Sequence, residues 1–133
     1  MTLQQTYELV LLALVSWREA SGAGADAMLA VAWSVRNRAL NPAWYGVGWA
    51  DVISKKWQYS SMSAPGDPNL IRWPLVSDPS WASALAIAQL VYEGSGADPT
   101  QGAINYYSTD IAPPSWVSSM TFTVAVGPFR FYR

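Results

Sequence analysis

Hydrophobic residues first gather in a run at residues 9–17, which predicts the opening helix of the chain. We expect this helix to extend from Thr2 to about Arg18. Thr2 and Gln5 have the spacing of a capping box, in which each side chain bonds to the other residue's backbone N–H. The glycine-containing residues 21–24 should then end the helix.

The next apolar segment predicts a second helix over residues 27–40, with Asp26 as its N-cap. Apolar residues occupy nearly every side of this helix, which is typical of a buried central helix. Asn41 precedes a proline and therefore avoids helical angles, so the helix should end there. A short helical turn is expected from Trp49 to Ser54.

A third long helix is predicted from its end signals. Asp78 and Pro79 supply an N-cap and a first-turn proline for a helix that runs through Tyr92. Gly94 then supplies the C-terminal stop.

The C-terminal part alternates apolar and polar residues and predicts a β-hairpin. Residues 121–126 have the two-residue period of a strand, residues 127–128 are a Gly-Pro turn, and residues 129–132 should form the partner strand. The predicted class is α+β, mainly helical, in a single domain that spans residues 1–133 and ends in this hairpin.

The composition supports one core and argues against several classes of function. The 133 residues are 51% hydrophobic, enough for one domain. Only 13% are charged and the formal net charge is -1, so we expect no nucleic-acid partner. The first apolar stretch is broken and too short for a membrane span, so we expect no integral membrane segment. The chain has no cysteine and no histidine, which excludes disulfides, the Ser-His-Asp triad and most zinc sites. No EF-hand spacing links the aspartates, so we expect no metal and no cofactor.

Glu19 stands at the end of the first apolar run and is the candidate general acid/base. On a helix it lies over Leu12 and Val15, an apolar stripe whose burial would favour the protonated form that a general acid needs. The alternative is a polar residue at a helix end, although the helix dipole disfavours a carboxylate there.

Aromatic residues are abundant, with eight Trp and seven Tyr. Flat rings with a polar edge suit the apolar faces and hydroxyl groups of sugars. Each ring taken singly fits a core position better, but their concentration in irregular segments favours a glycan-binding groove. The residues concerned are Trp44, Trp49, Trp57, Tyr59, Trp73, Tyr106, Tyr107 and Trp116.

Short motifs follow one another along most of the chain: Glu19-Ala20, Ala30-Val31-Ala32, Asn37-Arg38, Gln58-Tyr59-Ser60, Gly66-Asp67-Pro68-Asn69, Asp98-Pro99-Thr100, Gly102-Ala103, Tyr106-Tyr107, Pro114, Trp116 and residues 127–132. Each motif alone is weak, but the ordered set resembles the cell-wall hydrolases of the spore-cortex-lytic (SleB) type, which have relatives among phage lysis proteins. The segment from Gly66 to Asn69 is similar to the phage-type members.

The resemblance implies a lysozyme-like, lytic-transglycosylase-like fold and a peptidoglycan-degrading enzyme that cleaves between N-acetylmuramic acid and N-acetylglucosamine. It implies lytic transglycosylation that leaves 1,6-anhydromuramic ends, with Glu19 acting first as acid and then as base. The substrate-binding residues that it implies are Gln58, Tyr59, Ser60, Asn105, Tyr106, Tyr107 and Trp116. The chain departs from the family at two positions. Ala23 stands where many members have a second Glu, and Phe129 or Arg130 stands where many have a His.

A single assignable carboxylate agrees with transglycosylation, because the C6 hydroxyl of the sugar can then attack the anomeric carbon in place of water. Ordinary glycosidases need two carboxyl groups. The main alternative is therefore a hydrolytic muramidase in which the fold brings Asp67 or Asp110 close to Glu19. A non-catalytic glycan-binding or virion structural module is a further alternative.

The expected location follows from the first residues, which carry no positive charge before the apolar run. A secretory signal needs a basic start and a small-residue cleavage site. We therefore expect a phage endolysin-like monomer that is made in the cytoplasm and acts on the cell wall after membrane disruption.

Overall fold

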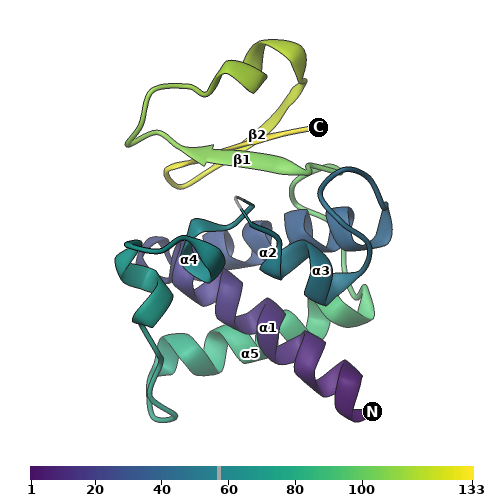
Figure 1. The fold of residues 1–133 in the computed structure, drawn as a ribbon, viewed down its shortest axis with the longest axis vertical. Helices are drawn as coiled ribbons and strands as arrows, with labels where there is room; N and C mark the ends of the chain where they lie inside the picture. Colours follow the sequence, from purple (N-terminus) through teal and green to yellow (C-terminus); the bar gives the residue numbers. More distant parts are fainter. Residues whose placement is uncertain (57) are drawn as a thin grey trace.

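The computed structural model describes residues 1–56 and 58–133 of the chain. Helices fill one end of the molecule and a small sheet lies at the other (Figure 1). With η for a 3-10 helix, the order is α1 (Leu3–Ala20), η1 (Ser21–Ala23), α2 (Ala25–Leu40), α3 (Trp49–Ser54), α4 (Ser60–Ser63), η2 (Pro68–Ile71), α5 (Pro79–Glu93), β1 (Asn105–Ser108), η3 (Ser115–Ser119), β2 (Phe122–Val126) and β3 (Phe129–Tyr132). The predicted class, α+β and mainly helical, is confirmed.

The first helix begins as predicted. The Thr2 hydroxyl accepts a hydrogen bond from the Gln5 backbone N–H at 3.1 Å, and the Gln5 side chain accepts one from the Thr2 N–H at 2.7 Å. The helix continues to Ala20 instead of ending near Arg18. Glu19 therefore lies in the last helical turn, and helix geometry sets the direction of its side chain.

The N-cap of α2 was predicted at Asp26, and that prediction is wrong. Gly24 occupies the N-cap position with a φ of 95°, and α2 begins at Ala25. Glycine adopts this backbone conformation without steric cost, so the chain passes from η1 directly into α2. Asp26 lies instead in the first turn, where the helix dipole favours a negative charge. The predicted burial of α2 is confirmed, since buried residues occur along it from Ala27 to Ala39.

Helix α5 has the predicted signals at both ends. The Asp78 carboxylate accepts a hydrogen bond from the Ser80 backbone N–H at 2.9 Å, and Pro79 is the first helical residue. Gly94 ends the helix in the left-handed conformation, with a φ of 73°. The predicted turn over residues 49–54 is α3 with the same bounds. Helix α4 and the 3-10 helices were not predicted.

The predicted C-terminal hairpin is confirmed as β2 and β3, but the sheet contains a third strand. Strand β1 pairs antiparallel with β3, which gives the order β1-β3-β2. In this register Tyr106 lies opposite Phe131, and Tyr107 lies opposite Arg130. Successive side chains of a strand point to opposite faces, so Tyr106 and Tyr107 face different sides of the sheet.

The core is formed mainly by α1, α2 and α5, which pack on one another, and the sheet contacts α2 (Figure 1). The largest fully buried side chains include Trp17, Phe131, Leu12, Met28 and Ile53. The Trp17 indole N–H donates to the Ser80 hydroxyl at 2.8 Å, which ties α1 to the start of α5. None of the helices in the described part of the chain has the length and apolar character needed to cross a membrane.

Candidate active site

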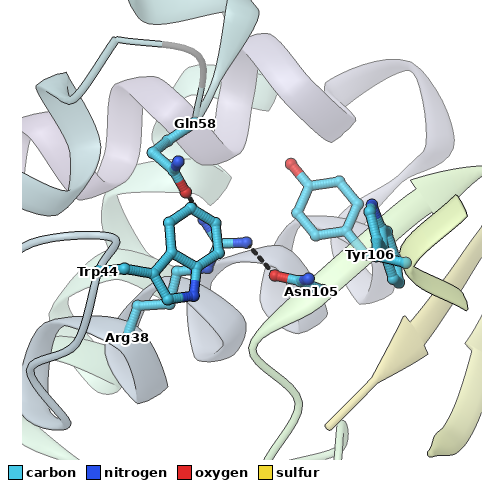
Figure 2. Close-up of a pocket in the computed structure, with 6 residues that line it drawn as sticks. Arg38, Trp44, Gln58, Asn105 and Tyr106 are labelled. Atoms are coloured by element: carbon cyan, nitrogen blue, oxygen red, sulfur yellow. Dashed lines mark hydrogen bonds between the residues drawn. The ribbon is translucent and has the colours of Figure 1, made fainter. Parts of the chain in front are cut away.

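A cavity of about 420 Å³ lies where the end of α2 meets the edge strand β1. Residues from five separate segments form its wall: Arg38, Trp44, Gln58, Asn105, Tyr106 and Trp116. Figure 2 shows the Arg38 guanidinium between the Gln58 and Asn105 amides, with the Tyr106 ring beside Asn105. We call this space the main cavity.

Glu19 meets the main cavity through Tyr106. The Tyr106 hydroxyl donates a hydrogen bond to Glu19 Oε1 at 2.6 Å, and the Glu19 side chain is half-buried. The Tyr106 ring is held from behind by Phe129 and Phe131, each with a ring centroid 5.5 Å away. The fold therefore connects the carboxylate at the end of α1 to a cavity residue on β1.

Tyr106 is well suited to remain a hydrogen-bond donor. Burial raises the pKa of the Tyr106 phenol well above its usual value, and the negative charge of Glu19 raises it further. The phenol therefore keeps its proton at neutral pH and can donate a hydrogen bond to the Glu19 carboxylate. Such a bond to a charged acceptor is short and strong.

The last turn of α1 is anchored by Arg18, on a different side from Glu19. The Arg18 guanidinium donates to the backbone carbonyl of Arg72 at 3.0 Å and to that of Ser61 at 3.1 Å, and it stacks over the Trp73 ring at 4.6 Å. Because Arg18 is buried, these contacts hold the helix end in place. The position of Glu19 therefore depends on a neighbour in the sequence that has no contact with the main cavity.

Arg38 organises the opposite wall, and the sequence reasoning assigned it no role. Its guanidinium, only 7% exposed, donates to the Ile104 carbonyl, to Gln58 Oε1 at 2.6 Å and to Asn105 Oδ1. The signal available was an Asn-Arg pair at the end of an apolar helix. Nothing in the sequence showed that the arginine side chain points inward.

Tyr59 lies beneath Arg38 and away from the cavity surface. It is 2% exposed, and the Arg38 guanidinium carbon is 5.4 Å from its ring centroid. Burial raises the pKa of Tyr59 to about 12, an effect that Arg38 opposes and Glu19 adds to. Its hydroxyl makes no hydrogen bond to any described residue. The structure therefore places this predicted substrate-binding residue behind the wall of the main cavity.

A second group of motif residues supports β1 from behind. The Asp98 carboxylate accepts hydrogen bonds from the Asn37 amide at 2.8 Å, from the Thr100 hydroxyl at 2.6 Å and from two backbone N–H groups. Burial raises the pKa of Asp98, but these hydrogen bonds outweigh it and leave the pKa below its usual value. Asn37 also donates to the carbonyl of Ala103, next to β1. The network sets the position at which Asn105 and Tyr106 enter the cavity wall.

Tyr107 lies on the other face of the sheet and contacts the cavity only through Trp116. The ring centroids of Tyr107 and Trp116 are 6.2 Å apart, and both pack on Tyr132, at 6.0 Å and 5.3 Å. Tyr107 thus supports Trp116, whose ring borders the main cavity. The predicted pair Tyr106-Tyr107 is divided between the two faces.

The other residues that the sequence singled out differ in where they lie relative to the main cavity. Ser60 is exposed at the start of α4 and is not part of the cavity wall. Trp44, noted only as one of the aromatic residues, is 68% exposed and borders the cavity. Trp49 is buried against Tyr92, with ring centroids 4.9 Å apart, and Trp57 lies outside the described residues.

The described residues of the cavity wall include no carboxylate; Glu19 is joined to the wall by its hydrogen bond from Tyr106, and Asp67 and Asp110 are not part of the wall. Asp67 caps η2 by accepting the Asn69 backbone N–H at 2.8 Å. Asp110 is exposed and accepts a hydrogen bond from the Ser108 hydroxyl at 3.0 Å. Within the described residues, no cluster of three His, Cys, Asp or Glu could hold a metal ion.

A family model described as Cell Wall Hydrolase matches residues 22–132, a range that begins just after Glu19. A search of curated proteins gives no match.

Two solved structures share the fold along most of the chain. The catalytic domain of the Bacillus cereus SleB protein superposes with a TM-score of 0.75 and 20% identity, over 100% of this chain and 93% of that one. The catalytic domain of a germination-specific lytic transglycosylase, SleB from Bacillus anthracis, gives a TM-score of 0.73 and 20% identity, over 95% of this chain and 93% of that one. The predicted SleB-like fold is thereby confirmed.

Proposed function

The chain belongs to the Cell Wall Hydrolase family, and from this premise we propose that it degrades peptidoglycan by cleaving the glycan strand between N-acetylmuramic acid and N-acetylglucosamine. The main cavity offers aromatic rings beside amide and guanidinium groups, the combination that sugar binding uses. Trp44 and Trp116 are placed to contact sugar faces, while Gln58 can bond to polar substituents.

The reaction that we propose is lytic transglycosylation, and the observation that carries it is the 2.6 Å hydrogen bond from Tyr106 to Glu19. With Glu19 protonated, its carboxyl group donates that proton to the glycosidic oxygen as the bond to the anomeric carbon breaks. The resulting carboxylate then takes the proton of the C6 hydroxyl, whose oxygen closes on the anomeric carbon. One carboxyl group serves both proton transfers, and the product has a 1,6-anhydro ring.

Tyr106 supports Glu19 in both roles. Its hydroxyl fixes Oε1 by a hydrogen bond and stabilises the carboxylate formed after the first proton transfer. The other carboxyl oxygen is left to transfer the proton. A hydrolytic mechanism would need a second carboxylate near the cleaved bond. The two candidates, Asp67 and Asp110, are outside the cavity wall and bond to Asn69 and Ser108, whereas Glu19 bonds to the wall residue Tyr106.

Mass spectrometry of digested peptidoglycan tests the proposal. Purified wild-type protein should release fragments that end in 1,6-anhydromuramic acid, and Glu19→Gln at equal concentration should release almost none. Reducing ends from wild-type protein would support a hydrolytic muramidase instead. Absence of fragments from a folded wild-type protein would support a non-catalytic glycan-binding or virion structural module.

A finer proposal is that the chain is a phage endolysin-like member that acts after the membrane is disrupted. The support is the similarity of the segment from Gly66 to Asn69 to phage-type members. Cells that express the chain in the cytoplasm should grow until a permeabilising agent is added and should then lyse. Lysis without such an agent would contradict this proposal.

A further inference from the structure

The guanidinium of Arg38 lies between two side-chain amides in the main cavity. Its Nη1 donates to Gln58 Oε1 at 2.6 Å, and its Nη2 donates to Asn105 Oδ1 (Figure 2). Its Nε donates to the backbone carbonyl of Ile104, and its planar group stacks 5.4 Å from the ring centroid of Tyr59. Each of the three guanidinium nitrogens therefore donates one hydrogen bond within the protein.

These contacts fix which end of each amide faces Arg38. An arginine side chain has five N–H donors and no acceptor, so only the carbonyl oxygen of an amide can face it. A reversed Gln58 or Asn105 amide would place N–H groups against the guanidinium. The amide nitrogens of both residues must therefore point away from Arg38.

The two amide nitrogens have different surroundings. The Asn105 Nδ2 group donates to Met120 Sδ at 3.2 Å, so it is already used within the protein. The Gln58 Nε2 group makes no hydrogen bond to any residue that the structure describes, and Gln58 borders the main cavity. Its N–H donors are therefore available to a ligand on this wall, and the Arg38 guanidinium is bonded to the carbonyl oxygen of the same amide.

We propose that Arg38 is a positioning residue that makes Gln58 an obligate hydrogen-bond donor, and that the main cavity thereby selects glycans whose sugars carry an acetamido carbonyl over glycans with free amino groups. This inference rests on the proposed function, because it names the substituent that the same cavity recognises. An acetamido oxygen accepts the Gln58 N–H. A protonated amino group has only donors, so it would leave the Gln58 N–H unpaired and would add a positive charge near Arg38.

This selectivity is tested by the binding of N-acetylglucosamine tetramers and glucosamine tetramers to Glu19→Gln, which prevents turnover, followed by calorimetry. These probes carry no lactyl group, so a preference between them excludes the muramic carboxylate as its source and reports the exchange of an acetamido group for a protonated amine. We expect the acetylated tetramer to bind at least about tenfold more tightly, the effect of one well-made hydrogen bond to a ligand. Equal binding of the two tetramers would overturn the inference.

Two variants at Gln58, made in the same Glu19→Gln background, test the role of the donor. Gln58→Glu keeps the size of the side chain and can still accept from Arg38, but it offers only acceptors to the cavity. It should abolish or reverse the preference for the acetylated tetramer. Gln58→Met removes donor and acceptor together and should reduce the preference to near unity without reversing it. An unchanged preference in either folded variant would overturn the inference.

Arg38→Lys tests the positioning step. Lysine keeps the positive charge but loses the planar fork that holds both amides, so Gln58 can rotate. In the Glu19→Gln background, the preference for the acetylated tetramer should fall several-fold in Arg38→Lys. Gln58→Glu should still alter the preference in the protein that keeps Arg38. Full preference in a folded Arg38→Lys variant would show that Arg38 does not orient Gln58.

Parallel digestion of peptidoglycan and of chemically de-N-acetylated peptidoglycan separates this inference from the proposed function. If wild-type protein releases no products but still binds the acetylated tetramer more tightly, the proposed cleavage is refuted and the proposed acetamido selectivity stands. If wild-type protein cleaves both forms of peptidoglycan at the same rate, the acetamido selectivity is refuted and the proposed enzymatic function stands.

Discussion

The main cavity and a second, smaller cavity are both bordered by tryptophans, yet they differ in the groups beside the rings. The smaller cavity, of about 180 Å³, is formed by Val10, Leu14, Trp73, Pro74 and Trp81. Its residues come from α1, α5 and the segment that precedes α5, and they are apolar. The main cavity, of about 420 Å³, adds a guanidinium, two amides and a phenol.

The two arginines at the helix ends differ in the same way as the two cavities. Arg18 and Arg38 are both buried in the last turns of their helices, and both donate to backbone carbonyls. Arg18 donates to the backbone carbonyls of Ser61 and Arg72 and stacks on Trp73 at the smaller cavity. Arg38 also donates to two side chains that border the main cavity. Aromatic residues therefore mark both cavities, but convergent polar groups distinguish the one suited to a glycan.

The largest expected effect is that of Glu19→Gln, which keeps the side-chain size but cannot transfer a proton. The rate of glycan cleavage should fall by about 10²–10⁴-fold, the usual contribution of general acid–base catalysis. Release of soluble fragments measures the rate, and a thermal melt should show a folded variant. A folded variant with full activity would remove Glu19 from the mechanism.

Tyr106→Phe and Tyr107→Phe each remove one hydroxyl, and the two hydroxyls lie on opposite faces of the sheet. Tyr106→Phe removes the donor to Glu19 while its ring stays packed on Phe129 and Phe131. Hydrogen bonds to charged groups contribute about 1.5–3 kcal/mol, so the rate should fall by roughly 10–150-fold. Tyr107→Phe is the matched control and should change the rate by less than about twofold. Equal losses in both variants would contradict a special role for the Tyr106 hydroxyl.

Asp98→Asn tests the support of β1 and should have a smaller effect on the rate. The new amide N–H would face donors that now bond to the carboxylate, including the Asn37 amide, so stability should fall by roughly 1 kcal/mol at pH 7. The rate should fall a few-fold because β1 carries two residues of the main cavity.

The pH dependence of this effect follows from the lowered pKa of Asp98. The stabilising contribution of the carboxylate is fully present above the unfolded-state value of about 3.9 and is lost as the pH falls through the lower folded value. The difference in melting temperature between wild type and Asp98→Asn should therefore shrink on acidification below about pH 4. A difference that stays constant from pH 7 to pH 2 would contradict this explanation.

The smallest effect on activity is expected at the smaller cavity. Trp73 is 69% exposed, and Trp73→Ala removes its stacking with Arg18, which contributes about 0.5–1 kcal/mol at exposed sites. The melting temperature should fall slightly and the cleavage rate should stay unchanged. A loss of rate as large as that of Tyr106→Phe would move part of the glycan site to this cavity.

Local signals in the sequence predicted the elements that carry their own caps or periods. The capping box of α1, the Asp-Pro start and Gly end of α5, and the alternation of the hairpin are all properties of neighbouring residues. Strand β1 has no such signal, because it exists through pairing with β3 and through the Asn37–Asp98 network behind it. The N-cap of α2 was predicted at the wrong residue because Gly24, which follows η1, caps the helix through its backbone conformation and has no side chain to mark the position.

The sequence predicted only part of the residue set of the candidate site, and it predicted none of the contacts within it. The sequence pointed to Glu19 and Tyr106, but they are 87 residues apart and their hydrogen bond depends on how α1 meets the sheet. Likewise, Gln58 and Asn105 were expected to bind substrate, and only the fold shows that Arg38 stands between them. Whether a helix-end arginine points inward or into solvent is decided by packing.

The most direct test of where the glycan binds uses the indole N–H signals of the eight tryptophans in an NMR titration. The sample is Glu19→Gln with an N-acetylglucosamine tetramer, and the signals are assigned with Trp→Phe variants at positions 44, 73, 81 and 116. The account predicts that the signals of Trp44 and Trp116 shift with saturation while those of Trp73 and Trp81 stay in place. Saturating shifts at Trp73 and Trp81, with Trp44 and Trp116 unchanged, would contradict it.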